Sequence, residues 1–205
     1  GDEQTIDLIG NLVTYDITLP NTGVTAPAPV IYQVLTQFSG TASDTAPGLV
    51  EKDDITIQDL TFASTYWNPV SGAWQNTVVW ATTTLTAGSW SVGTGLPAWV
   101  DGVNYRITSK ATDKAANAQT SAVVDFLVDR STPVAVLQNF VAVNSTVAAV
   151  SGQVRSSLDS LSGTAWDIAG AGGSAGKLDK VLVHIKRPAQ GGDGFGDQLF
   201  DIGLA

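Results

Sequence analysis

Phe38-Ser-Gly-Thr-Ala-Ser-Asp44 returns almost unchanged as Leu161-Ser-Gly-Thr-Ala-Trp-Asp167. Further along, Asp54-Ile-Thr-Ile57 is matched by Lys180-Val-Leu-Val183, and the second copy is longer because it contains a Gly-rich segment at residues 169–176. Repeats on the scale of about 100 residues are tandem domains, whereas solenoids use units of about 20 to 50 residues. The sequence therefore predicts two copies of one structural unit.

The fold class is predicted to be all-β. Segments rich in Val, Ile, Thr and aromatic residues are separated by Gly, Pro, Asn and Asp clusters, and no segment keeps a helical period for three turns. Tyr105 and Ile107 alternate with polar neighbours, which indicates a strand with one buried face. In the unit between residues 28 and 133, we expect an antiparallel two-sheet sandwich with these side chains inward: Ile55, Ile57, Tyr105, Ile107, Phe126 and Val128. The segment 140–158 fits either a strand pair or a short helix.

Two short segments punctuated by proline divide the chain, one at residues 19–29 and one at residues 128–133. Proline restricts itself and the residue before it to extended conformations, so we expect stiff joints at both places. Residues 1–27 are interpreted as the closing strands of a preceding unit or an N-terminal extension. Residues 28–133 are predicted to form one complete domain, and residues 134–205 a second, incomplete domain. The alternation in residues 11–19 also suits a strand donated to a neighbouring chain.

Composition excludes several classes of function. The 205-residue chain has 19 acidic and 10 basic residues, a net charge of -9, and no Lys/Arg cluster that would attract a nucleic acid backbone. No apolar run reaches the length of about 20 residues that crosses a bilayer. The absence of Cys rules out disulfides and thiolate metal sites.

Catalysis is not expected from this set of residues. His184 is the single histidine, and no G-x-S-x-G motif accompanies it. Asp53 and Asp54 are consecutive strand residues, so they point to opposite faces and do not form the paired carboxylates of a glycosidase.

Five landmarks follow one another along the middle of the chain: Ser39-Gly-Thr-Ala-Ser-Asp44, Tyr66-Trp-Asn68 with Trp74, Asp101-Gly-Val-Asn-Tyr-Arg-Ile107, Ala111-Thr-Asp-Lys-Ala-Ala-Asn117, and the exit segment from Val124 to Pro133. In order and spacing they resemble the immunoglobulin-like tandem repeats of large bacterial surface adhesins, biofilm proteins and surface-layer proteins. The family's patterns are close to A-x-D-x-A-G-N and V-D-x-T-x-P, so Ala116 replaces a glycine and Ser131 is an insertion. The resemblance implies tandem immunoglobulin-like antiparallel β-sandwiches at an extracellular cell surface.

Candidate metal ligands lie at or beside predicted strand ends, where successive units meet. They are Asp44, Asp113, Asn117 and Asp129, and the second copy adds Asp167. Calcium prefers such hard oxygen ligands, although Asp and Asn also cap turns through their own side chains. The resemblance to calcium-stiffened adhesin repeats favours the metal site. Gly191-Gly-Asp-Gly-Phe-Gly-Asp197 departs from the calcium-turn pattern and is interpreted as a loop.

The expected function is structural: a surface-layer, filament or adhesin-stalk segment that contacts adjacent repeats or copies of itself. The alternative is a carbohydrate-binding or accessory module of a secreted polysaccharide-degrading enzyme, with exposed aromatic rings stacking on glycans. The six Trp residues suit a core without disulfides better than a binding platform. Asn144-Ser-Thr146 is a glycosylation sequon in archaeal or eukaryotic secreted chains.

Overall fold

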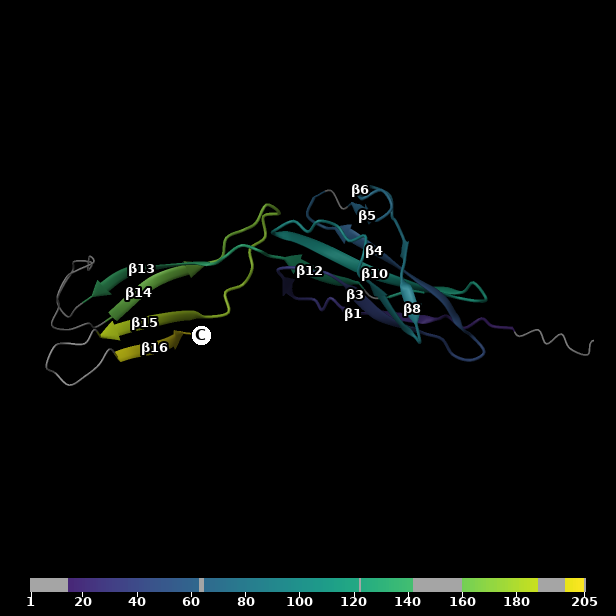
Figure 1. The fold of residues 1–205 in the computed structure, drawn as a ribbon, viewed down its shortest axis with the longest axis horizontal. Coiled ribbons are helices and arrows are strands. Elements are labelled where there is room, and N and C mark those ends of the chain that lie inside the picture. The colour runs from purple at the N-terminus through teal and green to yellow at the C-terminus, as the bar shows by residue number, and fades with distance from the viewer. Residues whose placement is uncertain (1–14, 63–64, 122, 142–159, 188–197, 205) are drawn as a thin grey trace, which may run out of the picture.

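The computed structural model describes residues 15–62, 65–121, 123–141, 160–187 and 198–204, and it contains no helix among them. Figure 1 shows two bodies along the long axis, the middle unit (β1 to β12) and the smaller C-terminal unit (β13 to β16). The predicted all-β class is confirmed. The strands are β1 (Asn21–Ala26), β2 (Ile31–Tyr32), β3 (Phe38–Ser43), β4 (Val50–Asp59), β5 (Tyr66–Asn68), β6 (Ala73–Gln75), β7 (Ala81–Thr82), β8 (Thr84–Thr86), β9 (Ser89–Val92), β10 (Val103–Asp113), β11 (Ala118–Thr120), β12 (Val124–Val128), β13 (Val134–Val141), β14 (Ser160–Trp166), β15 (Val181–Arg187) and β16 (Gln198–Leu204).

The middle unit is a sandwich of two sheets. One sheet has the order β1-β3-β9-β8, and the other has the order β2-β12-β10-β4-β5-β6, with β7 and β11 attached to β4 and β10. Neighbouring strands pair antiparallel except β12 and β2, which are parallel. β10 is the longest strand and runs through the whole middle unit (Figure 1). It therefore connects the two ends at which the candidate site residues lie.

Aromatic rings fill the space between the two sheets. Phe38 of β3 packs against Trp99 and Phe126, and Trp99 meets Tyr105 edge to face with ring centroids 4.9 Å apart. Burying a large apolar side chain stabilises a fold by about 1.5–3 kcal/mol. These buried rings therefore stabilise a core that contains no disulfide. The inward positions predicted from the alternating pattern are confirmed, because these side chains are all buried: Ile55, Ile57, Tyr105, Ile107, Phe126 and Val128.

Strand pairing joins β1 to the middle unit. β1 is hydrogen-bonded to β3 along its whole length, from Asn21 opposite Ser43 to Ala26 opposite Ser39. The sequence interpretation placed residues 1–27 before the domain at residues 28–133, yet these two strands share one sheet. The reason is that the prolines at 27 and 29 lie in the connection from one sheet to the other, and such a connection has the composition of a linker.

The C-terminal unit repeats the first hairpin of the middle unit. β14 pairs with β13 as β3 pairs with β1, and the register shifts next to the same glycine in both: at Gly40 opposite Val24, and at Gly163 opposite Leu137. The repeated sequence therefore forms the same local structure twice. β15 and β16 form a second hairpin. The described residues of this unit form two separate two-stranded sheets, and a second sandwich stays a prediction.

Candidate metal centres at the two ends of the middle unit

Three carboxylates meet at the end of the middle unit that is farther from the C-terminal unit. Asp16 lies before β1, Asp44 directly follows β3, and Asp113 is the last residue of β10. One oxygen from each lies within 4.8 Å of the others. These residues form the first cluster. Asp113 is fully buried, although its neighbours in the cluster carry the same charge.

Asn117 holds Asp113 in place. The Asn117 backbone N–H donates to Asp113 Oδ1 at 2.8 Å, and its side-chain Nδ2 donates to Asp113 Oδ2 at 2.9 Å. Nδ2 also reaches the backbone oxygen of Asp16 at 3.2 Å. Ala116, which stands where the family pattern has glycine, takes a positive φ of 69° in this loop. The structure therefore brings together three of the four predicted ligands, Asp44, Asp113 and Asn117.

One carboxylate oxygen of the first cluster lacks a hydrogen-bond donor. Asp44 Oδ2 is buried and has no hydrogen-bond partner. A Cβ on Gly48 would come within 2.2 Å of that oxygen and 2.7 Å of Asp16 Oδ2, so a glycine is required beside the cluster. Hydrogen bonds from the Thr18 hydroxyl and backbone N–H lower the pKa of Asp16, which favours its charged form. A buried carboxylate oxygen that has no donor and lies beside two other carboxyl groups suits a hard cation such as Ca²⁺.

Three further aspartates, called the second cluster, lie at the opposite end of the middle unit, although in the part of the chain that the structure describes only the first cluster brings three carboxylate oxygens within 4.8 Å of one another. Asp129 follows β12, Asp167 follows β14, and Asp101 precedes β10. Asp101 accepts hydrogen bonds from Arg130 N at 2.6 Å and from Ser131 Oγ at 2.7 Å, and these bonds lower its pKa. Desolvation raises the pKa of Asp129, and the negative charges of Asp167 and Asp101 add to this effect. Arg130 offsets part of the negative charge at this end, because its positive charge also lowers the pKa of Asp101.

Two of the three aspartates and a nearby glycine correspond between the two clusters. Asp16 corresponds to Asp129, since each lies four residues before a proline, and Asp44 corresponds to Asp167 in the repeated motif. Gly176 takes the place of Gly48, because a Cβ there would come within 2.0 Å of Asp129 Oδ2 and 2.5 Å of Asp167 Oδ2. The third carboxylate differs: Asp113 is the last residue of β10, whereas Asp101 precedes that strand.

Asp129 does not join the other predicted ligands. Asp101 precedes β10 and Asp113 ends it, and a strand rises about 3.3 Å per residue, so the length of β10 separates the clusters by roughly 33 Å. The exit residue that meets Asp44 is Asp16, which the sequence interpretation missed. Comparing Asp16-Ile-Thr-Leu-Pro20 with Asp129-Arg-Ser-Thr-Pro133 would have identified it.

The Gly-rich segment at residues 169–176 contacts the turn before β10. Gly172 N donates to Asp101 O at 2.8 Å, Ser174 N donates to Gly102 O at 3.2 Å, and Asn104 Nδ2 donates to Ser174 Oγ at 2.9 Å. A Cβ on Gly172 would come within 2.3 Å of Gly102 O, so only glycine allows this approach. This segment is called the glycine clasp. It connects the C-terminal unit to the middle unit beside the second cluster.

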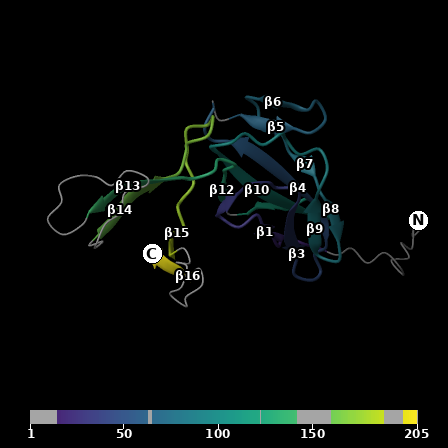
Figure 2. The same ribbon diagram turned by 60° about the vertical axis from the view of Figure 1, so that its left-hand side comes forward.

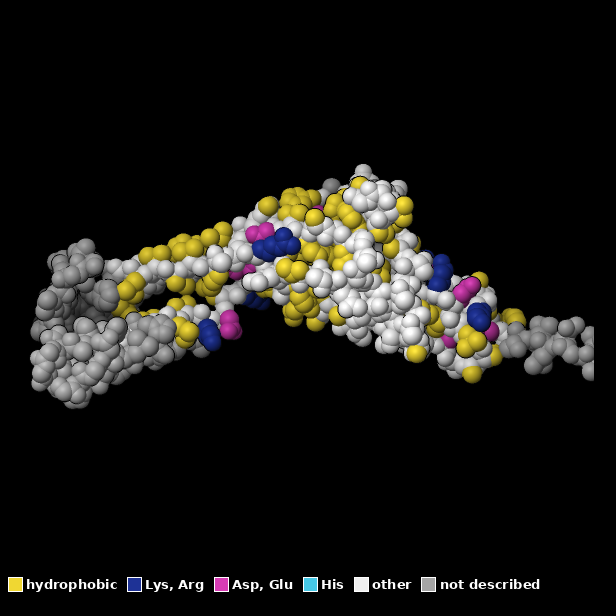
Figure 3. Space-filling model, viewed as in Figure 1, with side chains coloured by type: hydrophobic (Ala, Val, Ile, Leu, Met, Phe, Trp, Pro, Cys, Tyr) yellow, Lys and Arg dark blue, Asp and Glu magenta, His cyan; other side chains and the backbone are white. Residues whose placement is uncertain are grey.

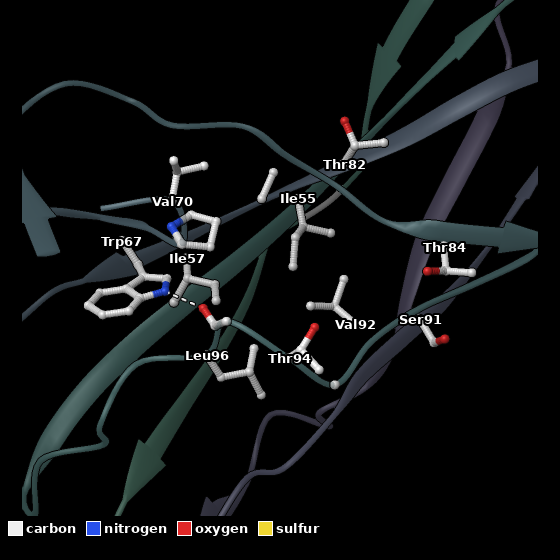
Figure 4. Close-up of a pocket in the computed structure, with 14 residues that line it drawn as sticks. Ile55, Ile57, Trp67, Val70, Thr82, Thr84, Ser91, Val92, Thr94 and Leu96 are labelled. Atoms are coloured by element: carbon white, nitrogen blue, oxygen red, sulfur yellow. Dashed lines mark hydrogen bonds between the residues drawn. The ribbon is translucent and has the colours of Figure 1, made fainter. Parts of the chain in front are cut away.

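The aromatic residues mostly serve the core. Trp90 and Trp99 are buried, and Trp74 stacks on Tyr105 with ring centroids 5.8 Å apart. Trp67 borders a cavity of about 510 Å³ at the open edge between the sheets, and its indole Nε1 donates to Gly95 O (Figure 4). Thr94 is one of the residues that add hydroxyl groups to the lining. Figure 3 shows a face on which uncharged side chains predominate and Lys and Arg are scattered.

Three other sequence features contribute less to the candidate site. His184 lies in β15 opposite Asp201. The sequon at Asn144 and the segment Gly191 to Asp197 lie outside the described residues, as do residues 142–158 of the segment left open between strand and helix. In the part of the chain that the structure describes, no helix is long and apolar enough to span a membrane.

Comparisons with known proteins give little guidance. No protein-family model matches the chain, and no curated protein matches it. A solved structure of the fibronectin(III)-like modules of Clostridium thermocellum CbhA aligns with 55% of this chain and 48% of its own length, at 18% identity and a TM-score of 0.36. The match thus covers about half of each chain, and this TM-score is too low to establish a shared fold.

Proposed function

We propose that the chain is a structural segment of an extracellular surface protein, built from stacked immunoglobulin-like domains whose joints bind calcium. The observation that supports the proposal is a repeated arrangement of residues at the two ends of the middle unit. An exit aspartate, an opening aspartate and a glycine recur at both ends of the middle unit. A joint that recurs along one chain is what a spacer, filament or stalk needs.

Each proposed joint binds its cation between segments of successive units. Asp16, Asp44, Asp113 and Asn117 supply oxygens at the first joint. Ca²⁺ accepts six to eight oxygen ligands in flexible geometry, whereas Mg²⁺ demands a near-ideal octahedron and dehydrates reluctantly. The bound ion offsets the mutual repulsion of the carboxylates and fixes the exit of one unit against the opening of the next. The result is a stiff connection.

At the proposed second joint, Asp101, Asp129 and Asp167 supply the oxygens. The glycine clasp adds hydrogen bonds between the units. The partners of such a segment are adjacent repeats or copies of itself.

The alternative of a carbohydrate-binding module is supported by the cavity beside Trp67, and a glycan array tests it. Saccharide binding that Trp67→Ala abolishes would favour that alternative.

Calorimetry with calcium tests the proposal. Chelator-treated protein is titrated with CaCl₂ and then with MgCl₂, and its thermal unfolding is followed in both salts. A ligand that binds only the folded state stabilises it by about 2.7 kcal/mol at 100 times its dissociation constant, so the melting temperature should rise with calcium. Asp125→Asn is the matched control, because Asp125 pairs with Arg106 away from both clusters. No binding at millimolar calcium and a melt indifferent to chelator would reject the cation.

A further inference from the structure

Asp53 of β4 is a carboxylic acid inside the sandwich core. Its side chain is 0% exposed and lies on the face of β4 that meets the other sheet. Thr22 of β1, from that other sheet, donates its hydroxyl to Asp53 Oδ2 at 2.5 Å. Asp53 Oδ1 is buried and has no hydrogen-bond partner. One neutral hydroxyl is thus the side-chain partner of a buried acid.

No cation offsets a charge at this position among the described residues. Lys52 pairs with Asp54 at 3.0 Å, and Lys110 lies over the Trp80 ring at 4.3 Å. Thr83 donates hydrogen bonds from its backbone N–H and its hydroxyl to the backbone oxygen of Asp53, which leaves the Asp53 carboxyl group without a donor from Thr83.

The elements packed around Asp53 present polar or acidic groups. β1 presents Thr22, β3 presents the apolar Ala42, and β10 presents Ser109, Ala111 and, beyond them, Asp113. An ionised Asp53 would therefore face the hydroxyls of Thr22 and Ser109 with acidic groups beyond them.

We propose that Asp53 carries a proton in the folded middle unit at mildly acidic pH, and that the core thereby gains stability as the pH falls. The Thr22 hydroxyl also lies 2.9 Å from Ser109 Oγ, so it can accept a hydrogen bond from protonated Asp53 while it donates its own hydrogen bond to Ser109. Transfer of an unpaired charge into an apolar interior is costly, and such groups become neutral instead. This buried acid is a proton-binding site that works independently of the proposed cation sites.

The direction of the pH effect follows from the burial. Desolvation raises the pKa of Asp53 from 3.8 to about 6, while the hydrogen bond from Thr22 opposes the rise and the charge of Asp54 adds to it. A group whose pKa is higher in the folded state stabilises that state below its unfolded pKa, and this stabilisation disappears as pH rises through the folded pKa. If the pKa of Asp53 is higher by about two in the folded state than in the unfolded state, its titration changes the unfolding equilibrium constant by about 100-fold. The change should fall between about pH 4 and pH 7.

Carboxyl ¹³C NMR of the full chain in calcium-free buffer tests the proposal directly. The Asp53 side-chain carbon should titrate near pH 6, well above Asp125, whose pKa its Arg106 partner lowers. An Asp53 midpoint below about pH 4.5 overturns the proposal. Because the wild-type protein is measured, this result does not depend on whether a variant folds.

Asp53→Asn supplies the second measurement. The neutral isostere should remove the part of the pH dependence of the free energy of unfolding that Asp53 causes between pH 4.5 and 7.5. This variant should also be harder to unfold than the wild type at pH 7.5. Asp125→Asn is the control, and its free energy of unfolding should change with pH as that of the wild type does over that range. Asp129 titrates equally in the wild type and in Asp53→Asn, so the difference between the two isolates Asp53. An unchanged slope in Asp53→Asn overturns the proposal.

Discussion

Phe38 and Leu161 begin the two copies of the repeated motif, and their surroundings differ. Phe38 is 0% exposed and packs against two aromatic rings, whereas Leu161 is half-buried in a hairpin of the C-terminal unit. A Cβ on Gly40 would come within 2.0 Å of Gly23 O and 2.2 Å of the Trp90 ring, while the nearest atom to a Cβ on Gly163 would be Val136 O at 2.6 Å. Both copies nevertheless keep the same pairing and the same register shift. The motif thus specifies a hairpin locally, and the strands that follow decide how deeply it is buried.

The largest expected difference between the copies is in stability. Phe38→Ala removes a ring from a closed core and should lower the free energy of unfolding of the middle unit by about 3–5 kcal/mol. Leu161→Ala should cost less than about 1 kcal/mol, because the side chain is only half-buried. Denaturant unfolding followed by Trp fluorescence and by circular dichroism measures both. Equal losses would show that the two copies are buried alike.

The two acidic clusters are distinguished by their third carboxylate. Asp113→Ala should abolish calcium binding at the first joint and leave the second intact, so about half of the calcium equivalents should remain in calorimetry. Asp101→Asn should have the reverse effect. Loss of one site removes up to about 2.7 kcal/mol of stabilisation at 100 times the dissociation constant. If either variant lost all binding, the clusters would not be independent sites.

The glycine clasp is specific to the second joint, and its removal should loosen that joint alone. Gly172→Ala forces the segment away from Gly102 and breaks two backbone hydrogen bonds, each worth about 1 kcal/mol. Spin labels on the middle and C-terminal units should then show a broader distance distribution. Ala171→Ser is the control, since Ala171 is exposed. An unchanged distribution would mean that the clasp does not hold the units together.

The smallest effect is expected at the surface ion pair of Arg106 and Asp125, which lies away from both clusters. Arg106 lowers the pKa of Asp125, so the stabilisation is present above the unfolded pKa and is lost as pH falls through the folded one. Asp125→Asn should cost about 0.2–1 kcal/mol at neutral pH, because both side chains are largely solvated. Its calcium response should equal that of the wild type. A changed calcium response would show that this ion pair takes part in cation binding.

Period-two alternation predicted the inward residues of β10 and β12 because a strand has only two faces. It could not reveal which end of a strand meets which neighbour. Asp129 was therefore grouped with Asp44, although about one strand length separates them. Asp16 was missed because its role depends on an alignment of two proline-bounded exits that differ at most positions. The Gly-rich segment was recognised as an insertion, yet its contact with Gly102 is a tertiary feature that local sequence does not encode.

Figure 2, turned by 60° from Figure 1, shows the C-terminal unit attached at one end of the middle unit, with the chain entering at the other end. In the proposed joints, the exit and opening residues would set the direction of each unit relative to its neighbour through local contacts. Contacts of this head-to-tail kind, repeated identically, apply the same rotation at every step and do not close into a ring unless that rotation divides a full turn. A longer row of such units would therefore wind as a spiral of constant pitch, and that pitch would be fixed by the few residues of one joint.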